Sequence, residues 1–400
     1  MVDVAVIESS PRVLMLRFAD VGTATYASLR VVGAPDQLVT WVLDDARLQQ
    51  MSDQLAAALP DPRPGEQITD ALARACTVGA YATTESEREL AEGLGALLSD
   101  QAWALLQPTD GVPALFVSPS VRLSRVPWGL LAVPGNDLRL IELADVFLAV
   151  PPNVVNSPRN QRDPSRRSDS VAVILDPKVP GHRPDSALGS VLGRPSADSA
   201  LARHFADRSV LPSVADPAEL FRRTDVDRNW LAAALAQGPA RLIYVGHASA
   251  AEDRTGYADR AALHLAEPEP LSAADIIAAR LPIPPRVALL ACSSGGDYRF
   301  DEATGLVAAM ILGGAQVVTA TLWSLPTTAG YRKYAAPTDP VHDPMSELVI
   351  AVDEAHTSAA PGSAVNHWQR ACLRRWRDGD VAASPLYWAA LVSSAVDGVR

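Results

Sequence analysis

Residues 286–296 read RVALLACSSGG, and they place a cysteine where an apolar run stops. Every position from Val287 to Ala291 is apolar, which is typical of a strand covered on both faces in a parallel sheet. Cys292 follows at once, and two serines and two glycines come after it. Small residues after such a strand predict a tight loop at the carboxyl edge of the sheet, where α/β proteins build their sites.

Similar apolar runs recur on both sides of this stretch. They are VAVILD (171–176), RLIYVG (241–246) and QVVTATLW (316–323). Segments with helical spacing lie between or beside them, at 196–207, 227–238, 271–281 and 302–314. Because strands and helices alternate, the sequence predicts an α/β fold with a mainly parallel sheet covered by helices on both faces.

The chain divides into two parts on this pattern. Residues 1–85 form an α+β region of unassigned role, with expected strands at 12–18, 28–33 and 38–45 and a helix at 46–59. A helical stretch follows at 68–107, and residues 86–400 form the larger α/β domain. Two polar stretches interrupt that domain: an expected exposed loop at 156–170 and an expected mobile loop at 327–345.

A histidine ends the apolar run at 241–246 in the same way that Cys292 ends its own. If the two strands are parallel in one sheet, His247 and Cys292 emerge on the same edge. An imidazole beside a thiol can take its proton and make it a nucleophile for an acyl carbon. The backbone N–H groups of Cys292 and Ala248 are the candidate donors to the resulting oxyanion. The alternative is that each residue is structural, since a buried cysteine often serves as a small apolar residue.

Composition excludes several classes of protein. The formal net charge of −11 disfavours nucleic-acid partners. No apolar run is long enough to span a membrane, and the first residues do not read as a signal peptide. Three cysteines are too few for a disulfide framework or a CxxC metal site, so we expect no metal. We expect no other cofactor either. A chain without a disulfide framework is typical of a reducing compartment, so we expect a cytoplasmic location. Arginine far outnumbers lysine, which suggests a GC-rich bacterial source.

The chain resembles the CHAT family of caspase-fold cysteine peptidases, the relatives of separase. The resemblance covers roughly residues 90–395. It rests on the segments VPWGLL (126–131), IYVGHAS (243–249), LHLAEPEPLSAADIIAARL (263–281), VALLACSSG (287–295), LVAAMILGGAQVVTATLW (306–323) and SPLYWAALV (384–392). It implies a caspase-like three-layer fold with six or so strands. It also implies Cys292 as nucleophile and His247 as general base and acid.

This resemblance implies an intracellular cysteine endopeptidase acting on a protein substrate. A separately encoded activator or regulatory protein is expected to switch it on, and bacterial members of the family suggest a role in defence. Two other functions stay open. One is a catalytically silent caspase-fold scaffold that recruits partners through its N-terminal region. The other is acyl transfer or hydrolysis of a small substrate by the same two residues.

Three departures from the family pattern bear on the site. Ala248 stands where the family has glycine, and a backbone that required positive φ would be strained there. Leu325 and Pro326 stand where the family often has an aspartate after Trp323. The run before Cys292 also lacks the acidic residue that metacaspases place two positions earlier, so an arginine pocket of that type is not supported.

The loop after Cys292 supplies the remaining candidates. An acidic side chain there would suit a basic substrate residue, although these residues are equally typical of a solvated loop and a helix N-terminus. The candidate substrate-binding residues are Ser293, Asp297, Asp301 and Glu302.

Overall fold

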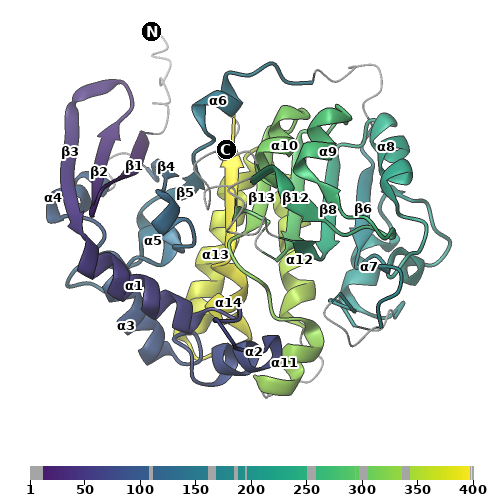
Figure 1. The fold of residues 1–400 in the computed structure, drawn as a ribbon, viewed down its shortest axis with the longest axis horizontal. Coiled ribbons are helices and arrows are strands. Elements are labelled where there is room, and N and C mark those ends of the chain that lie inside the picture. Colours follow the sequence, from purple (N-terminus) through teal and green to yellow (C-terminus); the bar gives the residue numbers. More distant parts are fainter. Residues whose placement is uncertain are drawn as a thin grey trace, which may run out of the picture.

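A large sheet runs through the whole molecule in the computed structural model (Figure 1). The structure describes residues 12–107, 111–160, 168–183, 188–193, 196–249, 258–292, 294–296, 305–335, 343–396 and 398. Eleven strands follow the order β3-β2-β1-β4-β5-β14-β13-β12-β8-β6-β7. Their bounds are β1 Val13–Val21, β2 Ala24–Val31, β3 Ala34–Asp44, β4 Ala114–Ser118, β5 Asp145–Leu148, β6 Val171–Leu175, β7 Val210–Leu211, β8 Arg241–Gly246, β12 Arg286–Ala291, β13 Val317–Thr321 and β14 Leu391–Ala395.

Two parallel blocks of opposite direction make up nine of the eleven strands of this sheet. Strands β13, β12, β8, β6 and β7 run parallel to one another, and β14, β5, β4 and β1 form the second parallel block. The blocks meet where β13 and β14 pair in antiparallel fashion. The prediction of a mainly parallel α/β sheet is confirmed. The sheet is larger than the six or so strands implied by the family resemblance, because the N-terminal strands extend it.

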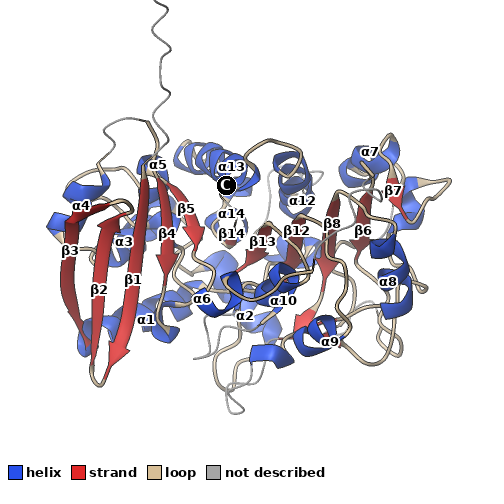
Figure 2. Ribbon diagram, turned by 90° about the horizontal axis from the view of Figure 1, so that it is seen from above, coloured by secondary structure: helices blue, strands red, loops and turns tan. Residues whose placement is uncertain are grey.

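Helices cover both faces of the central strands, as Figure 2 shows. One face packs against α7 (Ala200–Ala206), α12 (Pro344–Ala355) and α13 (Pro361–Arg377). The other packs against α6 (Pro152–Val155), α8 (Arg228–Ala236), α9 (Ala273–Ala278) and α10 (Leu306–Leu312). Burial on both sides explains why these strands are continuously apolar.

The N-terminal region is built differently. Strands β1, β2 and β3 pair in antiparallel fashion, and β1 pairs with β4 in parallel. One face of these strands is buried, whereas the other leaves Tyr26 and Val42 exposed. This one-sided burial explains why apolar and polar residues alternate in them. The helices that follow are α1 (Asp45–Ala58), α2 (Ile68–Thr77), α3 (Thr84–Gly95) and α4 (Asp100–Leu106).

Shorter elements complete the described fold. A small sheet pairs β9 (Ala248–Ser249), β10 (Ala262–Leu263) and β11 (Leu271–Ser272). The remaining helices are α5 (Leu140–Leu143), α11 (Thr328–Tyr334) and α14 (Pro385–Trp388), with 3-10 turns at Val121–Leu123, Trp128–Leu130, Pro217–Leu220, Ala258–Arg260 and Val381–Ala383.

Two expectations about loops have different outcomes. The segment 327–345 was expected to be a loop, but its first half is α11, whose N-cap Thr327 accepts a hydrogen bond from the Gly330 N–H. Residues 336–342 lie outside the described residues. In the other loop, at 156–170, the described positions 156–160 and 168–170 carry neither helix nor strand.

The α12 helix ends at a buried histidine that makes stability depend on pH. His356 is fully buried, its Nε2 lies 2.8 Å from Thr319 Oγ1, and burial lowers its pKa to about 3. An unfolded histidine titrates near 6.5, so between pH 6.5 and 3 the unfolded chain binds the proton that the folded chain rejects. His356 therefore makes its full contribution to the stability of the folded chain above pH 6.5, and this contribution is lost as the pH falls.

We expect acidification from pH 7 to pH 5 to lower the free energy of unfolding by about 2 kcal/mol through His356. Urea unfolding at the two pH values measures the loss. His356→Gln should remove this part of the pH dependence, whereas the same change at the exposed His367 should preserve it. An unchanged pH dependence in His356→Gln would show that another group is responsible.

Candidate active site

The register of two neighbouring strands places His247 beside Cys292. Strands β8 and β12 are parallel, and their last paired residues are Gly246 and Ala291. His247 and Cys292 are therefore the next residues on chains that lie about 4.8 Å apart. Both stand at the carboxyl edge of their parallel block.

Side-chain alternation directs both residues to the same face of the sheet. In β12, Leu290 faces the core under α7 and α12, whereas Ala291 faces the core under α10. In β8, Val245 faces the first of these cores. Because successive side chains alternate, His247 and Cys292 both continue on the α7 and α12 face.

A backbone carbonyl orients the imidazole. His247 Nε2 lies 2.9 Å from the Gly189 carbonyl oxygen. Since a carbonyl only accepts, Nε2 carries the proton, and in the neutral ring Nδ1 is left as the basic nitrogen. The same carbonyl accepts a hydrogen bond from Arg222 Nη1 at 3.0 Å. The histidine is thus held in the tautomer whose Nδ1 can receive a proton.

A buried carboxylate near this carbonyl, that of Asp176, was not predicted from the sequence. Asp176, fully buried at the end of β6, accepts hydrogen bonds from Ser190 Oγ at 2.7 Å and Arg222 Nη1 at 3.2 Å. Asp176 and Arg222 both adopt left-handed backbone conformations, with φ of 52° and 51°. The signal was present, because Asp176 ends an apolar strand as His247 and Cys292 do.

Burial keeps the Cys292 side chain in its thiol form. Burial raises the pKa of the Cys292 thiol, while hydrogen bonds with Ser324 and with its own backbone N–H act in the opposite direction. Ser324 follows the end of β13, the strand next to β12 in the sheet. Since the pKa stays raised, the thiol is mostly protonated at neutral pH and needs a base before it can attack.

The turn after Cys292 packs directly on β13. The Gly295 N–H donates to the Thr321 carbonyl at 2.9 Å. A Cβ at position 295 would lie 3.2 Å from that oxygen and 3.3 Å from both Ala320 Cβ and Val392 Cγ2. Glycine is therefore favoured here by close packing.

Ala248 lies in extended backbone as part of β9, so the strain expected from a positive φ does not arise. The His264 N–H donates to the His247 carbonyl at 3.0 Å, and Ala248 lies opposite Leu263. In an antiparallel ladder, hydrogen-bonded and non-hydrogen-bonded pairs alternate. The Ala248 N–H therefore points away from β10 and is not used by that ladder.

The predicted substrate-binding residues are not placed by the structure. Ser293, Asp297, Asp301 and Glu302 lie outside the described residues, so their role remains a prediction. Within the described ranges, no cluster of histidine, cysteine and acidic residues could hold a metal ion. No helix among those residues has the length and apolarity needed to cross a membrane.

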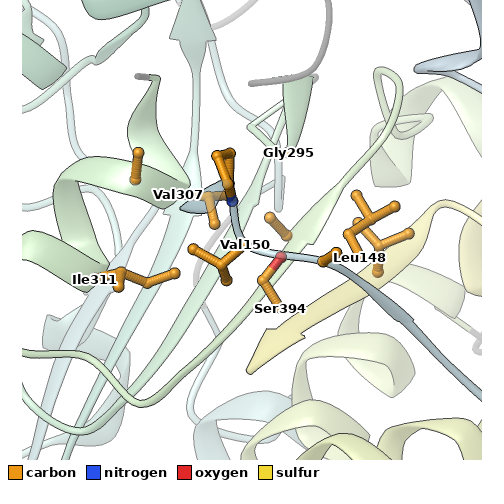
Figure 3. Close-up of a pocket in the computed structure, with 11 residues that line it drawn as sticks. Leu148, Val150, Gly295, Val307, Ile311 and Ser394 are labelled. Carbon is orange, nitrogen blue, oxygen red and sulfur yellow. The ribbon is translucent and has the colours of Figure 1, made fainter. Parts of the chain in front are cut away.

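An apolar pocket lies close to this site in sequence (Figure 3). Gly295, Val307 and Ile311 line it, together with Ala320 and residues of β5 and β14. Val307, Ile311 and Ala320 belong to the core under α10, opposite the face that Cys292 continues. Neither His247 nor Cys292 is among the residues that line this pocket.

Comparisons with known proteins point to one family. The CHAT domain matches residues 85–395. Two crystal structures of the Saccharomyces cerevisiae separase–securin complex are similar. The first has 10% identity and a TM-score of 0.44 and covers 96% of this chain and 30% of that chain. The second has 13% identity and a TM-score of 0.38, with 88% and 23% covered. This chain spans less than a third of those proteins, and no curated protein sequence matches it.

Proposed function

Because the chain belongs to the CHAT domain family over residues 85–395, we propose that it is a cysteine endopeptidase with Cys292 as nucleophile and His247 as base and acid. One observation carries this proposal: the in-register pairing that ends at Gly246 and Ala291 leaves His247 and Cys292 side by side. The substrate is a protein, the chemistry requires no cofactor, and the location is the bacterial cytoplasm in a defence role.

The proposed reaction begins with proton transfer from Cys292 Sγ to His247 Nδ1. The sulfur attacks the peptide carbonyl carbon, and the backbone N–H groups of Cys292 and Ala248 receive the oxyanion. The imidazolium, supported at Nε2 by the Gly189 carbonyl, protonates the leaving amine. Water deprotonated by His247 then hydrolyses the thioester and frees the sulfur.

Mass-spectrometric identification of new protein N-termini tests the endopeptidase function. Cells that make the wild-type chain are compared with cells that make Cys292→Ala at the same level. We expect cleaved proteins only with the wild type. If the termini are identical in both, the chain is not an endopeptidase under those conditions, and the scaffold alternative is favoured. The raised pKa of the Cys292 thiol, caused by its burial, supports that alternative.

The isolated chain is expected to be latent. A separately encoded activator that stabilises the competent site should raise turnover by on the order of 100-fold. This is the gain expected if about 1% of the molecules have a competent site without the activator. Fluorogenic peptide assays of the purified chain, with and without proteins encoded beside it, measure this gain.

Intact-mass measurement in the same assay separates partner activation from self-cleavage. A cut within residues 159–167, the basic stretch RNQRDPSRR, would accompany self-activation. Full activity from an uncut chain without any partner would contradict latency in both forms.

A further inference from the structure

We propose that Asp176 and Arg222 are positioning residues for the imidazole of His247, because their buried ion pair holds the Gly189 carbonyl against its Nε2. Both residues act through this carbonyl and not on the reacting atoms. The inference rests on the proposed function for the role of His247 as base and acid.

Two donors share the Gly189 carbonyl oxygen. His247 Nε2 lies 2.9 Å from it, and Arg222 Nη1 lies 3.0 Å from it. The same Nη1 also donates to Asp176 Oδ1 at 3.2 Å. This nitrogen of a guanidinium carries two protons, so it can serve both acceptors at once. A single arginine nitrogen therefore links the carbonyl that orients the imidazole to a buried carboxylate.

The second oxygen of this carboxylate holds the residues that follow Gly189. Asp176 Oδ2 accepts from Ser190 Oγ at 2.7 Å and from the Leu192 N–H at 3.3 Å. The Ser190 hydroxyl has one proton, and the charged carboxylate is a stronger acceptor than the Gly193 carbonyl 3.0 Å away. This segment contains neither helix nor strand. Its contacts with Asp176 therefore help to fix the position of the Gly189 carbonyl.

The backbone places both charged residues beside His247. Asp176 follows β6, and its N–H donates at 2.7 Å to the carbonyl of Val245, which lies two residues before His247 on β8. The Arg222 N–H donates at 3.1 Å to the carbonyl of Leu175, the last residue of β6. Asp176 and Arg222 have φ of 52° and 51°, a conformation that costs free energy in residues other than glycine. Strained backbone of this kind is typical of functional sites.

The ion pair also balances charge. In the proposed reaction His247 becomes an imidazolium, which then shares the Gly189 carbonyl oxygen with the Arg222 guanidinium. Two cations this close repel each other, and more strongly where water is excluded. The Arg222 side chain is only 14% exposed, and its partner Asp176 is fully buried. Because the carboxylate offsets the guanidinium charge, the arginine can support the carbonyl without opposing protonation of the imidazole.

Two-dimensional proton–nitrogen NMR of the full chain with ¹⁵N-labelled histidine tests this inference. A ring N–H that is hydrogen-bonded is protected from exchange with water, so the His247 Nε2 proton should give a signal at pH 8 that His247→Gln removes. Asp176→Asn removes the charge, and Arg222→Met removes the donor. Each should speed the exchange of this proton by about tenfold, the worth of one hydrogen bond. On a confirmed substrate each should lower kcat by about 10- to 100-fold, a loss that misplacement of a catalytic group can cause.

Glu87→Gln is the matched control. The Glu87 carboxylate is also buried and also pairs with an arginine, since Arg139 Nε lies 3.2 Å from its Oε1. This ion pair joins α3 to the residue before α5, in the part of the chain that precedes β6. The control variant should lose stability but keep the wild-type exchange rate and kcat.

Two results would overturn the inference. Unchanged exchange in both Asp176→Asn and Arg222→Met would mean that the carbonyl holds its place without the ion pair. Equally fast exchange in Glu87→Gln would mean that the effect comes from a general loss of stability. If a charge variant fails to fold, Ser190→Ala decides the question, because it removes one hydrogen bond to Asp176 and should also speed exchange.

The exchange readout separates the inference from the proposed function. It reports on the imidazole of His247 even if the chain cleaves no peptide. Peptide cleavage that persists in His247→Gln would refute only the proposed role of that residue as base and acid.

Discussion

Cys292→Ala abolishes peptide cleavage and covalent labelling by an acyloxymethyl ketone, while the chain stays folded: this is the largest effect that we expect. Loss of a nucleophile costs at least on the order of 10⁴-fold in turnover. The other two cysteines offer no substitute. Burial raises the pKa of Cys76 to about 11 and that of Cys372 to about 12, so both remain thiols at pH 7.

Labelled-peptide mapping and thermal unfolding together check this result. Cys76→Ala is the matched control, since it removes a half-buried thiol outside the site and should keep both activity and labelling. Because Cys292 is itself only half-buried, its truncation should change the free energy of unfolding by no more than about 1 kcal/mol. Labelling that is equal or faster at Cys76 or Cys372 would count against the assignment.

The parallel half of the sheet could be predicted because its signal is local. Strands buried on both faces must be apolar at every position, and the runs that end at Gly246 and Ala291 are short, bounded and separated by helices. The helix expected at 271–281 was equally readable, because Ser272 and Asp275 form a capping box at its start. Such patterns depend only on neighbours within a few residues.

The extent of the sheet could not be predicted in the same way. An alternating strand such as β1 buries one face whether it belongs to a separate unit or to the edge of a larger sheet. Its pairing with β4 joins residues about a hundred positions apart, and no local pattern specifies that partner. The sequence therefore predicted the N-terminal strands but not that they continue the central sheet.

The same reasoning explains what was found and missed in the candidate site. His247 and Cys292 each follow an apolar strand, and parallel α/β folds build their sites at the carboxyl ends of such strands. The sequence alone therefore locates both residues. The hydrogen bond between Ser324 Oγ and Asp61 Oδ1 has no comparable signal in the sequence, since Ser324 follows Trp323 in an irregular segment and Asp61 lies in a proline-containing turn after α1. Their contact exists only because the N-terminal region folds back on the end of β13.

His247→Ala is expected to lower turnover by about 10²- to 10⁴-fold, the usual contribution of a general base and acid. The physical reason is specific to this site. The Gly189 carbonyl holds the ring with Nδ1 unprotonated, and the raised pKa of Cys292 means that the thiol depends on that nitrogen. Measured on a confirmed substrate, the loss should fall on kcat, with KM little changed, because the imidazole acts on the proton and not on substrate affinity.

His264→Gln is the control for this variant. His264 is also buried near the end of β8, but its Nε2 lies 2.5 Å from Ser249 Oγ, and its ring has no partner on the Cys292 strand in the described residues. It should keep turnover within a few-fold of the wild type. Near-normal kcat in His247→Ala, on a substrate whose cleavage still requires Cys292, would mean that another base activates the thiol. The pairing of β8 with β12 would then serve the fold alone.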